Sequence, residues 1–589
     1  MTLHKKGVFS GMDPHNFPVR QVEPRSDVEI HLPDGRVLSG PRGINVGAFF
    51  QNPGFASPIP IMGAVVNGEL RELTYPIQMD SKVSPVSMAD ADGSRIYRRS
   101  LTFLLSAIFE RLYPDRVLGV DHSVASGGFF CKVDHGLPLT VEQVAALEHE
   151  MQRTVAQNLP FERQEVPLKE AQDYFVQKRQ QDKVRLMSYR TKPYLVLYSL
   201  QEYKDYHHGY MVPSTGYLKW FKLIPILPEG FILQYPRRHV PTELQELPEA
   251  IKLLDTFRQY GNWLQNLGIE SVGALNDAIQ EKRIREVVLI SEALHEQNIA
   301  QIAQRIADES KRAKVILIAG PSSSGKTTFS KRLTVQLLAQ GISPVPIELD
   351  NYFVDRELTP KDETGQFDFE ALSALNTRLL TQQLQALIAG EEVVLPKYNF
   401  RSGLSETGES LRLVRDQIII LEGIQGLNPQ LIPQIPADQT RRIYISALTQ
   451  LNLDRYNRIS TTDTRLLRRI VRDARERGYS AQQTIQRWES VRRGEKRYIF
   501  PYQENADDLF NSALVYELSA LKVLAEPLLR QVPYGTPEHI EAKRLLAFLE
   551  WFLPVEEKLI PDNSILREFV GNSILKDFKI WHSSSEISA

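Results

Sequence analysis

The segment AGPSSSGKTT, from Ala319 to Thr328, has residue types and spacing that suit the binding of a phosphate chain. The apolar run KVILIAG precedes it, and the helical pattern FSKRLTVQLLAQ follows it. In this setting the glycines let the backbone fold around phosphates, Lys326 reaches the terminal phosphates and Thr327 offers a hydroxyl to Mg²⁺. An ordinary turn of glycine and serine is the alternative. We predict a nucleoside triphosphate site formed by Gly320, Pro321, Ser322, Ser323, Ser324, Gly325, Lys326, Thr327 and Thr328.

Two carboxylates end later apolar runs of the same region. IELD ends at Asp350, and IIILE ends at Glu422. Doubly wound sheets bind ligands at the carboxyl ends of their strands, so both side chains are expected near the phosphate loop. Either can hold Mg²⁺ or its waters, and one beside an acceptor hydroxyl can take the proton as that hydroxyl attacks the γ-phosphorus. For each carboxylate taken singly, a helix N-cap is the alternative.

An arginine-rich segment, DTRLLRRIVRDARERG, lies further along the chain. Its arginines recur at three- and four-residue spacing, so a helix gathers several of them on one side: Arg465, Arg468, Arg469, Arg472 and Arg475. One interpretation is a solvated face relieved by Asp473 and Glu476. The other is a lid that lowers arginines onto a transferring phosphoryl group.

Adjacent histidines in DYHHGYMVPSTG, His207 and His208, raise the question of a metal site. Paired histidines on a loop more often serve as polar surface or hydrogen-bonding groups, and we expect that role here. The only cysteine is Cys131, which excludes an intramolecular disulfide and a zinc site with several cysteines.

The composition bounds the class of protein. A chain of 589 residues with 42% hydrophobic and 24% charged residues is expected to form three or four compact units. The formal net charge of −2 produces no global field toward nucleic acid or an anionic membrane, so any basic site is local. The apolar runs have strand length, which predicts no membrane segment and a cytoplasmic location.

The patterning changes several times along the chain. Turn signals predict hairpins in VEIHLPDGRVL and AVVNGELRELTYPI, and helical periods follow, one of them capped by Thr140. Helical segments then lead to five short apolar runs, KVILIAG, PVPIELD, EEVVLP, DQIIILEG and RRIYISA, which predict a parallel sheet covered by helices on both faces. The expected units are a flexible N-terminus (1–26), a small β domain (27–92), a mixed domain (93–245), a helical connector (246–312), an α/β domain (313–532) and a C-terminal tail (533–589).

The α/β region resembles the uridine kinase and phosphoribulokinase family. The resemblance rests on AGPSSSGKTTFSKRL, LDNYFVDR, FDFEAL, YNFRSG, LEGIQGLNPQL and the arginine-rich segment, in that order. It implies a P-loop kinase fold with a parallel sheet and a helical lid, using ATP and Mg²⁺. Asp350 is then the catalytic base, and Lys326 a catalytic group on the phosphates. Thr327, Glu422 and Asp350 would hold the metal; Arg469, Arg472 and Arg477 would be lid residues on phosphate; Asp368, Tyr398 and Phe400 would border the acceptor.

Two positions depart from the familiar uridine kinases. A histidine that contacts the base corresponds here to Gly403, and an arginine just after the Glu-Arg-Gly corresponds to Tyr479. Both positions serve the acceptor side. The resemblance therefore implies phosphoryl transfer to a hydroxyl of a nucleoside-like or sugar-containing molecule, with the acceptor left open.

The N-terminal half resembles a different family, the threonyl-tRNA synthetases. VEIHLPDGRVLSGPRGINVGAF is similar to their ubiquitin-like β-grasp TGS domain, and GGFFCKVDHGLPLTVEQVAALEHEMQ with VPSTGYLKWFKL is similar to their α+β editing domain. The editing site uses three histidines and a cysteine at positions that correspond here to Arg99, Phe103, His207 and Met211. The resemblance thus implies a degenerate editing site that serves recognition or regulation.

These resemblances leave two functions open. The first is an ATP-dependent kinase for a small-molecule acceptor, for which the family resemblance also implies self-association. The second is a regulatory NTPase whose synthetase-like half binds tRNA or another RNA.

Overall fold

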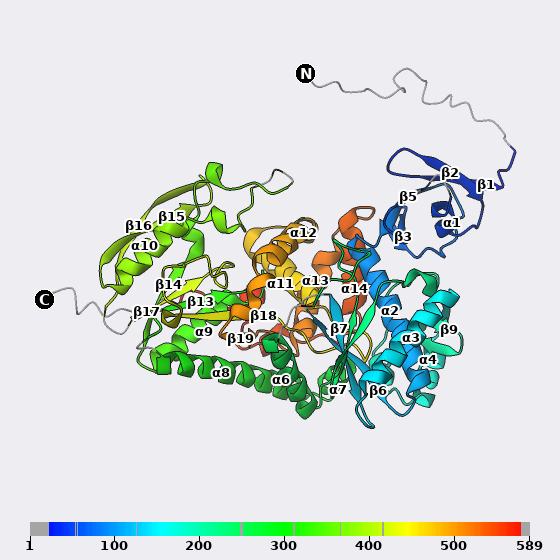
Figure 1. Ribbon diagram of the computed structural model, residues 1–589, viewed down its shortest axis with the longest axis horizontal. Helices are drawn as coiled ribbons and strands as arrows, with labels where there is room; N and C mark the ends of the chain where they lie inside the picture. Colours follow the sequence, from blue (N-terminus) through cyan, green and yellow to red (C-terminus); the bar gives the residue numbers. More distant parts are fainter. Residues whose placement is uncertain are drawn as a thin grey trace, which may run out of the picture.

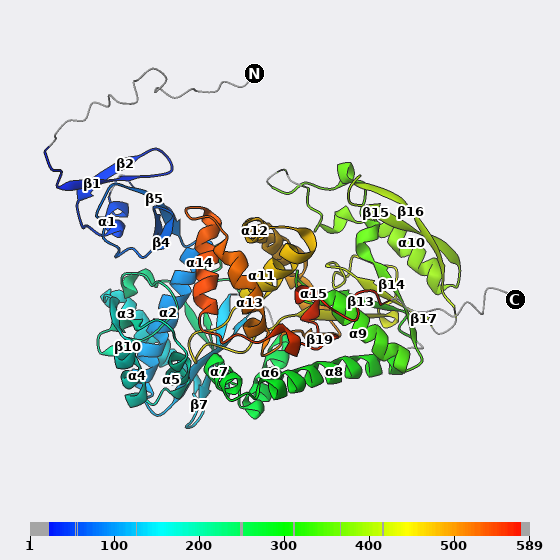
Figure 2. The same ribbon diagram turned by 180° about the vertical axis from the view of Figure 1, so that it is seen from behind.

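The computed structural model describes residues 23–578 apart from 53, 54, 56, 125, 126, 248–250, 310, 311, 364, 366, 415 and 416. A small β unit lies at one end of the molecule and a parallel sheet at the other, and the long helix α8 (Ile284–Glu309) runs along one side (Figures 1 and 2). Within the described ranges, none of the helices combines the length and apolar character needed to cross a lipid bilayer.

The first unit is a mixed five-stranded sheet with one short helix. Its elements are β1 (Asp27–His31), β2 (Val37–Pro41), α1 (Val46–Phe50), β3 (Ile61–Val66), β4 (Glu69–Arg71) and β5 (Ser81–Ser87). The strand order is β2-β1-β5-β3-β4, and β1 and β5 are parallel. Both predicted hairpins, β1–β2 and β3–β4, are confirmed.

The second unit packs two antiparallel sheets with helices. Its sheets have the orders β11-β12-β7-β6 and β10-β9-β8. Its elements are α2 (Ala91–Leu112), β6 (Val117–Val124), β7 (Gly128–Asp134), α3 (Val141–Gln157), β8 (Glu162–Pro167), α4 (Leu168–Gln177), α5 (Gln181–Ser188), β9 (Tyr194–Leu200), β10 (Tyr203–Asp205), β11 (Lys222–Ile226) and β12 (Gly230–Gln234). Thr140 caps α3 as predicted, by accepting from the Gln143 N–H. Because α2 starts at Ala91, the boundary expected at residue 92 falls in its first turn.

Three helices connect the halves: α6 (Ile251–Leu267), α7 (Val272–Gln280) and α8. They form part of the packed structure, since the amide of Asn276 on α7 donates to the Trp551 carbonyl (2.8 Å) and the Tyr260 hydroxyl on α6 donates to the Ala513 carbonyl (3.1 Å).

The third unit is a parallel five-stranded sheet with the order β14-β17-β13-β18-β19. Its strands are β13 (Val315–Ala319), β14 (Ser343–Glu348), β17 (Gln417–Glu422), β18 (Thr440–Ser446) and β19 (Asp508–Asn511). Alternate residues of β13 enter different cores. Ile316 and Ile318 pack with α9 (Lys326–Ala339), whereas Val315 and Leu317 pack with α10 (Thr377–Ile388). Helices thus cover both faces, as the unbroken apolar strands predicted.

Two predictions about this unit are wrong. The run EEVVLP is not a strand of the central sheet: it lies in β15 (Glu392–Asn399), which forms an antiparallel hairpin with β16 (Leu404–Arg412). Its side chains are mostly exposed or half-buried, unlike those of β13, because a hairpin outside the sheet needs no second apolar face. The fifth strand is instead β19, which follows the arginine-rich segment in the chain.

The segment expected to be a tail is folded from 533 to 578. It contains α14 (Pro537–Leu549) and α15 (Arg567–Val570), and α14 packs against α12 (Ala481–Tyr498) and α13 (Glu517–Arg530). On α14, Glu541 pairs with Arg95 of α2 (2.9 Å) and Arg544 pairs with Asp463 (2.8 Å). This helix therefore joins α2 to the arginine-rich segment that contains Asp463, and Figures 1 and 2 both show it beside α2.

Candidate active site

The phosphate loop lies at the carboxyl end of the central strand β13 and runs into the N-terminus of α9. Ser323 (φ 57°) and Gly325 (φ 90°) both adopt left-handed backbone conformations. Glycine takes this conformation without strain, which explains Gly325 as the residue before the helix. The turn directs the N–H groups of the first helical turn, which have no partner within the helix, toward one site, where their positive potential favours an anion.

Lys326 arches back over the loop. Its ammonium donates to the carbonyls of Gly320 (3.0 Å) and Pro321 (3.3 Å). Burial lowers the pKa of Lys326, while the carboxylates of Glu422 and Glu568 oppose that effect. A partly dehydrated ammonium in this position can bind phosphate oxygens with little water to displace.

Thr327 of the loop and Glu422 of β17, which are both predicted to hold Mg²⁺, lie next to each other. The Thr327 hydroxyl donates to Glu422 Oε1 over 2.8 Å. Glu422 ends β17, the neighbour of β13, so the sheet register places it beside the loop. Burial raises the pKa of Glu422 to about 7, and Lys326 counteracts it. One hydroxyl and one carboxylate suit Mg²⁺, which keeps several waters and takes further oxygens from substrate phosphates.

Asp350 follows β14 in the short helix η2 (Leu349–Tyr352), at the same edge of the sheet. Its side chain is exposed, yet the surrounding protein and then the charge of Glu348 raise its pKa, against the effect of Lys326. A carboxylate of raised basicity beside Lys326 is suited to accept a proton.

The arginine helix α11 (Thr461–Arg472) packs directly on the loop. Arg465 Nε donates to the Ser322 carbonyl (2.9 Å), Arg468 to the Ser323 carbonyl (3.4 Å) and Arg469 to the Ser322 hydroxyl (2.8 Å). The side chains of Arg465 and Arg468 are buried, so the interpretation as a solvated face is wrong. Both residues support the loop rather than point into the site.

The three predicted lid arginines share one carboxylate. Arg469, Arg472 and Arg477 all lie 3.2 to 3.4 Å from the buried Asp473. Only Arg469 also contacts the phosphate loop. Asp473 therefore gathers the three cations, and Arg469 links this group to the loop.

Two carboxylates of the loop's surroundings were not predicted. Glu495 on α12 accepts from the Ser322 N–H (2.9 Å) and pairs with Arg465, and Glu568 on α15 accepts from the Thr328 N–H (3.0 Å). Both lie far from the motif in sequence, in segments without a recognisable pattern. Only tertiary packing brings them to the loop.

The predicted acceptor residues lie on two segments beyond the sheet edge. Asp368 accepts from the Tyr498 hydroxyl (2.6 Å), and the rings of Tyr398 and Phe400 lie 5.1 Å apart, edge to face. Tyr398 is buried and its hydroxyl has no hydrogen-bond partner among the described residues, whereas Phe400 is 60% exposed. An exposed ring beside a buried aromatic wall can stack on a planar or sugar ring of an acceptor.

Gly403 stands at the position where the familiar uridine kinases have a histidine, and its surroundings leave no room for a side chain. It has φ 76°, and a Cβ there would lie 2.8 Å from the Arg356 guanidinium carbon. The Arg356 N–H also donates to the Gly403 carbonyl (2.7 Å). Arg356 thus occupies the space that a side chain at position 403 would need. A histidine there would be strained, both by this contact and by the left-handed backbone conformation.

The raised pKa of the buried Glu370 can be tested through the pH dependence of the protein's stability. Burial, and after it the charges of Glu495 and Asp368, raise the pKa of Glu370 to about 8, and its Oε2 is buried without a partner among the described residues. The folded state therefore binds the Glu370 proton more tightly than the unfolded state does. The contribution of this proton to the stability of the fold is complete below about pH 4 and is lost as the pH rises through 8.

From pH 5 to 8 the free energy of unfolding of the wild type should therefore fall relative to that of Glu370→Gln, by at most about 1.4 kcal/mol per pH unit. Above that range the difference should level off. Urea titrations of both proteins at five pH values measure it, and parallel curves would contradict the raised pKa.

The four positions of the expected degenerate editing site lie in one buried region. Arg99 donates to the Tyr210 carbonyl (2.6 Å), the rings of Phe103 and His207 lie 5.4 Å apart, and Met211 is buried. Burial lowers the pKa of His207 to about 3, so this side chain is neutral. The expected role of polar surface is wrong for His207, which is 3% exposed. In the part of the chain that the structure describes, no three His, Cys, Asp or Glu side chains form a metal-binding cluster.

Residues from the kinase-like half fill this region. The segment before the lid helix places the Tyr456 ring parallel to the His207 ring at 6.1 Å, and Asn457 accepts from the His208 N–H (2.9 Å). Arg455 forms an ion pair with Asp182 on α5 (2.5 Å). Because α11 starts at Thr461, the second unit directly contacts the segment that leads into the arginine helix.

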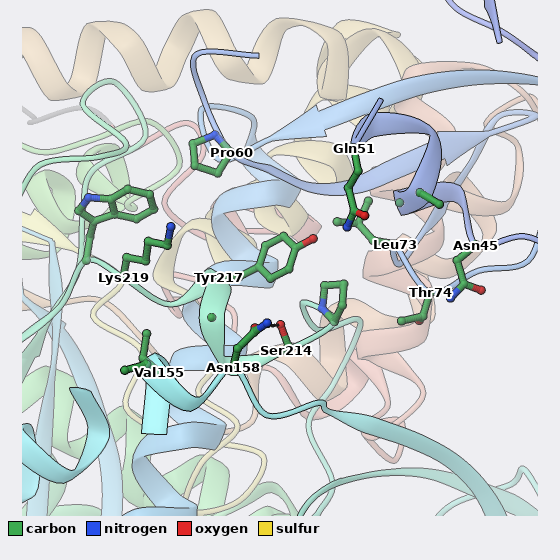
Figure 3. A pocket seen from close by; sticks show the side chains of 16 residues that line it. Asn45, Gln51, Pro60, Leu73, Thr74, Val155, Asn158, Ser214, Tyr217 and Lys219 are labelled. Carbon is green, nitrogen blue, oxygen red and sulfur yellow. Dashed lines mark hydrogen bonds between the residues drawn. The ribbon is translucent and has the colours of Figure 1, made fainter. Parts of the chain in front are cut away.

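A separate cavity of about 800 Å³ lies between the first two units (Figure 3). Gln51 reaches it from the first unit, and Asn158, Ser214, Tyr217 and Lys219 reach it from the second. It uses the loop VPSTGYLKW but none of the four degenerate positions.

The parallel sheet, the glycine-rich loop and the helix that starts at Lys326 together define an α/β domain of the P-loop nucleotide-binding class. Residues 315–518 match the family described as "Phosphoribulokinase / Uridine kinase family". The predicted resemblance of this region is confirmed.

The N-terminal region is similar to threonine–tRNA ligases, which confirms the second resemblance. The ligase of Thermotoga maritima is 31% identical over 201 residues, 34% of this chain and 31% of the ligase. Threonine–tRNA ligase 2 of Bacillus subtilis is 30% identical over 197 residues, 33% of this chain and 31% of that enzyme. The chain spans about a third of the length of these relatives.

Solved structures of kinases also align with about a third of the chain. A possible uridine kinase from Bacillus stearothermophilus aligns with 34% of this chain and 89% of its own, at 20% identity and a TM-score of 0.23. A D-glycerate 3-kinase from Cryptococcus neoformans aligns with 36% of this chain and 89% of its own, at 14% identity and a TM-score of 0.25.

Proposed function

We propose that this protein is an ATP- and Mg²⁺-dependent kinase that phosphorylates a hydroxyl of a nucleoside-like or sugar-containing small molecule. The observation that carries the proposal is the placement of the phosphate loop, the Thr327–Glu422 pair and Asp350 at one edge of the parallel sheet. Binding groups for a triphosphate, oxygen ligands for Mg²⁺ and a base thus meet at one place.

In the proposed reaction Asp350 takes the proton of the acceptor hydroxyl while the oxygen of that hydroxyl forms a bond to the γ-phosphorus. The bond from that phosphorus to the β–γ bridging oxygen breaks, and ADP leaves. Lys326 and the N–H groups of the loop hold the phosphates, and the arginines gathered by Asp473 stabilise the transferring group. Mg²⁺ held by Thr327 and Glu422 would neutralise charge on the phosphate oxygens.

The synthetase-like half is proposed to recognise a ligand or to regulate the kinase. The cavity beside Tyr217 and Lys219 supports recognition, because aromatic, amide and cationic groups converge there. The competing function is an NTPase regulated by tRNA or another RNA, which the similarity to tRNA ligases favours.

An acceptor panel separates the two functions. Purified protein is incubated with Mg-ATP and single nucleosides, sugars or sugar acids, and ADP release and product mass are measured. Phosphorylated product with one acceptor class is the expected result. ADP release stimulated by RNA, with no phosphorylated small molecule, would favour the NTPase instead.

A further inference from the structure

The C-terminal segment lies directly on the phosphate loop. A Cβ on Gly325 would lie 2.5 Å from Ile565 Cγ2, and the Phe569 ring lies 4.9 Å from the Arg468 guanidinium carbon. Lys331 of α9 donates to the carbonyls of Leu575 (2.7 Å) and Lys576 (2.9 Å). Residues 565–576 therefore contact both the loop and the helix that follows it.

Glu568 places a negative charge on the phosphate-binding N–H groups. Its Oε2 accepts from the Thr328 N–H over 3.0 Å. Thr328 is the third residue of α9, so this N–H has no partner within the helix and is one of the donors available to phosphate.

A folded scaffold presents this carboxylate. Ile565, Leu566 and Phe569 are fully buried, and Arg567 donates to the Ile560 carbonyl (2.6 Å) and to Glu557 Oε1 (3.1 Å). The half-buried Glu568 side chain is thus held at the loop by a well-packed turn.

We propose that Glu568 is an autoinhibitory group that occupies the position of a nucleotide phosphate on the first turn of α9. A bound nucleotide must displace the carboxylate to reach the Thr328 N–H, and the two negative charges repel each other at short range. Nucleotide affinity is thereby reduced, and any event that draws Glu568 away raises it. The inference rests on the nucleotide site of the proposed function.

The test compares direct binding of Mg-ADP and of adenosine by calorimetry to the full chain and to Glu568→Gln. The amide keeps the size of the side chain but removes its charge, so Mg-ADP should bind roughly tenfold more tightly. Adenosine lacks phosphates, and its affinity should not change. Glu556→Gln is the matched control, because Glu556 pairs with Lys558 in solvent on the same segment. Melting temperatures of all three proteins show that they are folded.

Unchanged or weaker Mg-ADP binding by Glu568→Gln would overturn the proposal. If only the wild type binds Mg-ADP, Glu568 is instead part of the nucleotide site. If neither protein binds Mg-ADP, this inference and the proposed function both fail, whereas equal binding by the two overturns the inference alone.

Discussion

Replacing Asp350 by asparagine should lower kcat for phosphoryl transfer by roughly two to four orders of magnitude. The carboxylate follows β14 at the edge of the sheet that carries the loop, and the surrounding protein and then the charge of Glu348 raise its pKa. Asparagine has nearly the same shape but cannot take the proton. Because Lys326 and the loop remain, affinity for nucleotide should change little.

Steady-state kinetics with the acceptor found in the panel and calorimetry with Mg-ADP measure the two effects separately. Glu357→Gln is a suitable control, since this exposed carboxylate lies seven residues further on and makes no contact with the loop in the described structure. Activity within tenfold of the wild type in Asp350→Asn would show that another group takes the proton. Loss of nucleotide binding would show a role in the phosphate site instead.

Replacing Lys183 by methionine should destabilise the protein by about 3–5 kcal/mol. Lys183 and Asp205 form an ion pair in which both side chains are fully buried. Asp205 also accepts from the Tyr203 hydroxyl (2.7 Å), and the Lys183 ammonium lies 4.7 Å from the centre of the Tyr456 ring. The substitution leaves an unpaired carboxylate in the interior, where the free energy cost of a charge is high.

The unfolding free energy from urea titration measures this loss. Asp205→Asn added to Lys183→Met should recover part of it, because the amide is neutral and its oxygen still accepts from Tyr203. Lys169→Met is the control, since Lys169 pairs with Asp173 on the surface and should contribute little. A loss no larger than that of the control would mean that water reaches the pair.

Several features of the candidate active site can be predicted from the local sequence. The loop from Gly320 to Thr328 needs only a glycine spacing, a preceding apolar strand and a following helix, all of which lie within about 25 residues. The positions of Asp350 and Glu422 also follow, because parallel strands that alternate with helices place their carboxyl ends at one edge. Likewise, the prediction of a degenerate editing site rests on Arg99, Phe103 and Met211, whose identities are read directly from the sequence.

Strand membership was harder to predict. EEVVLP is apolar enough for a strand of the central sheet. A hairpin strand that packs one face against a helix can have the same local pattern, so the pattern does not distinguish a central strand from a hairpin strand. The strand β19 was missed because only four residues pair there, and their pairing with β18 depends on the path of the lid helices.

The sequence by itself therefore predicted the phosphate loop and, through the resemblance to the synthetases, a degenerate editing site, since both predictions depend on residue identity at short spacing. Tertiary structure alone decided which distant groups reach that chemistry: Glu495 and Glu568 at the loop, and Tyr456 and Asn457 in the editing-like unit. These contacts join residues 170 to 250 positions apart, and they form only where separate hydrophobic cores pack against one another. No local period or spacing encodes such a meeting, because it depends on how complete surfaces fit.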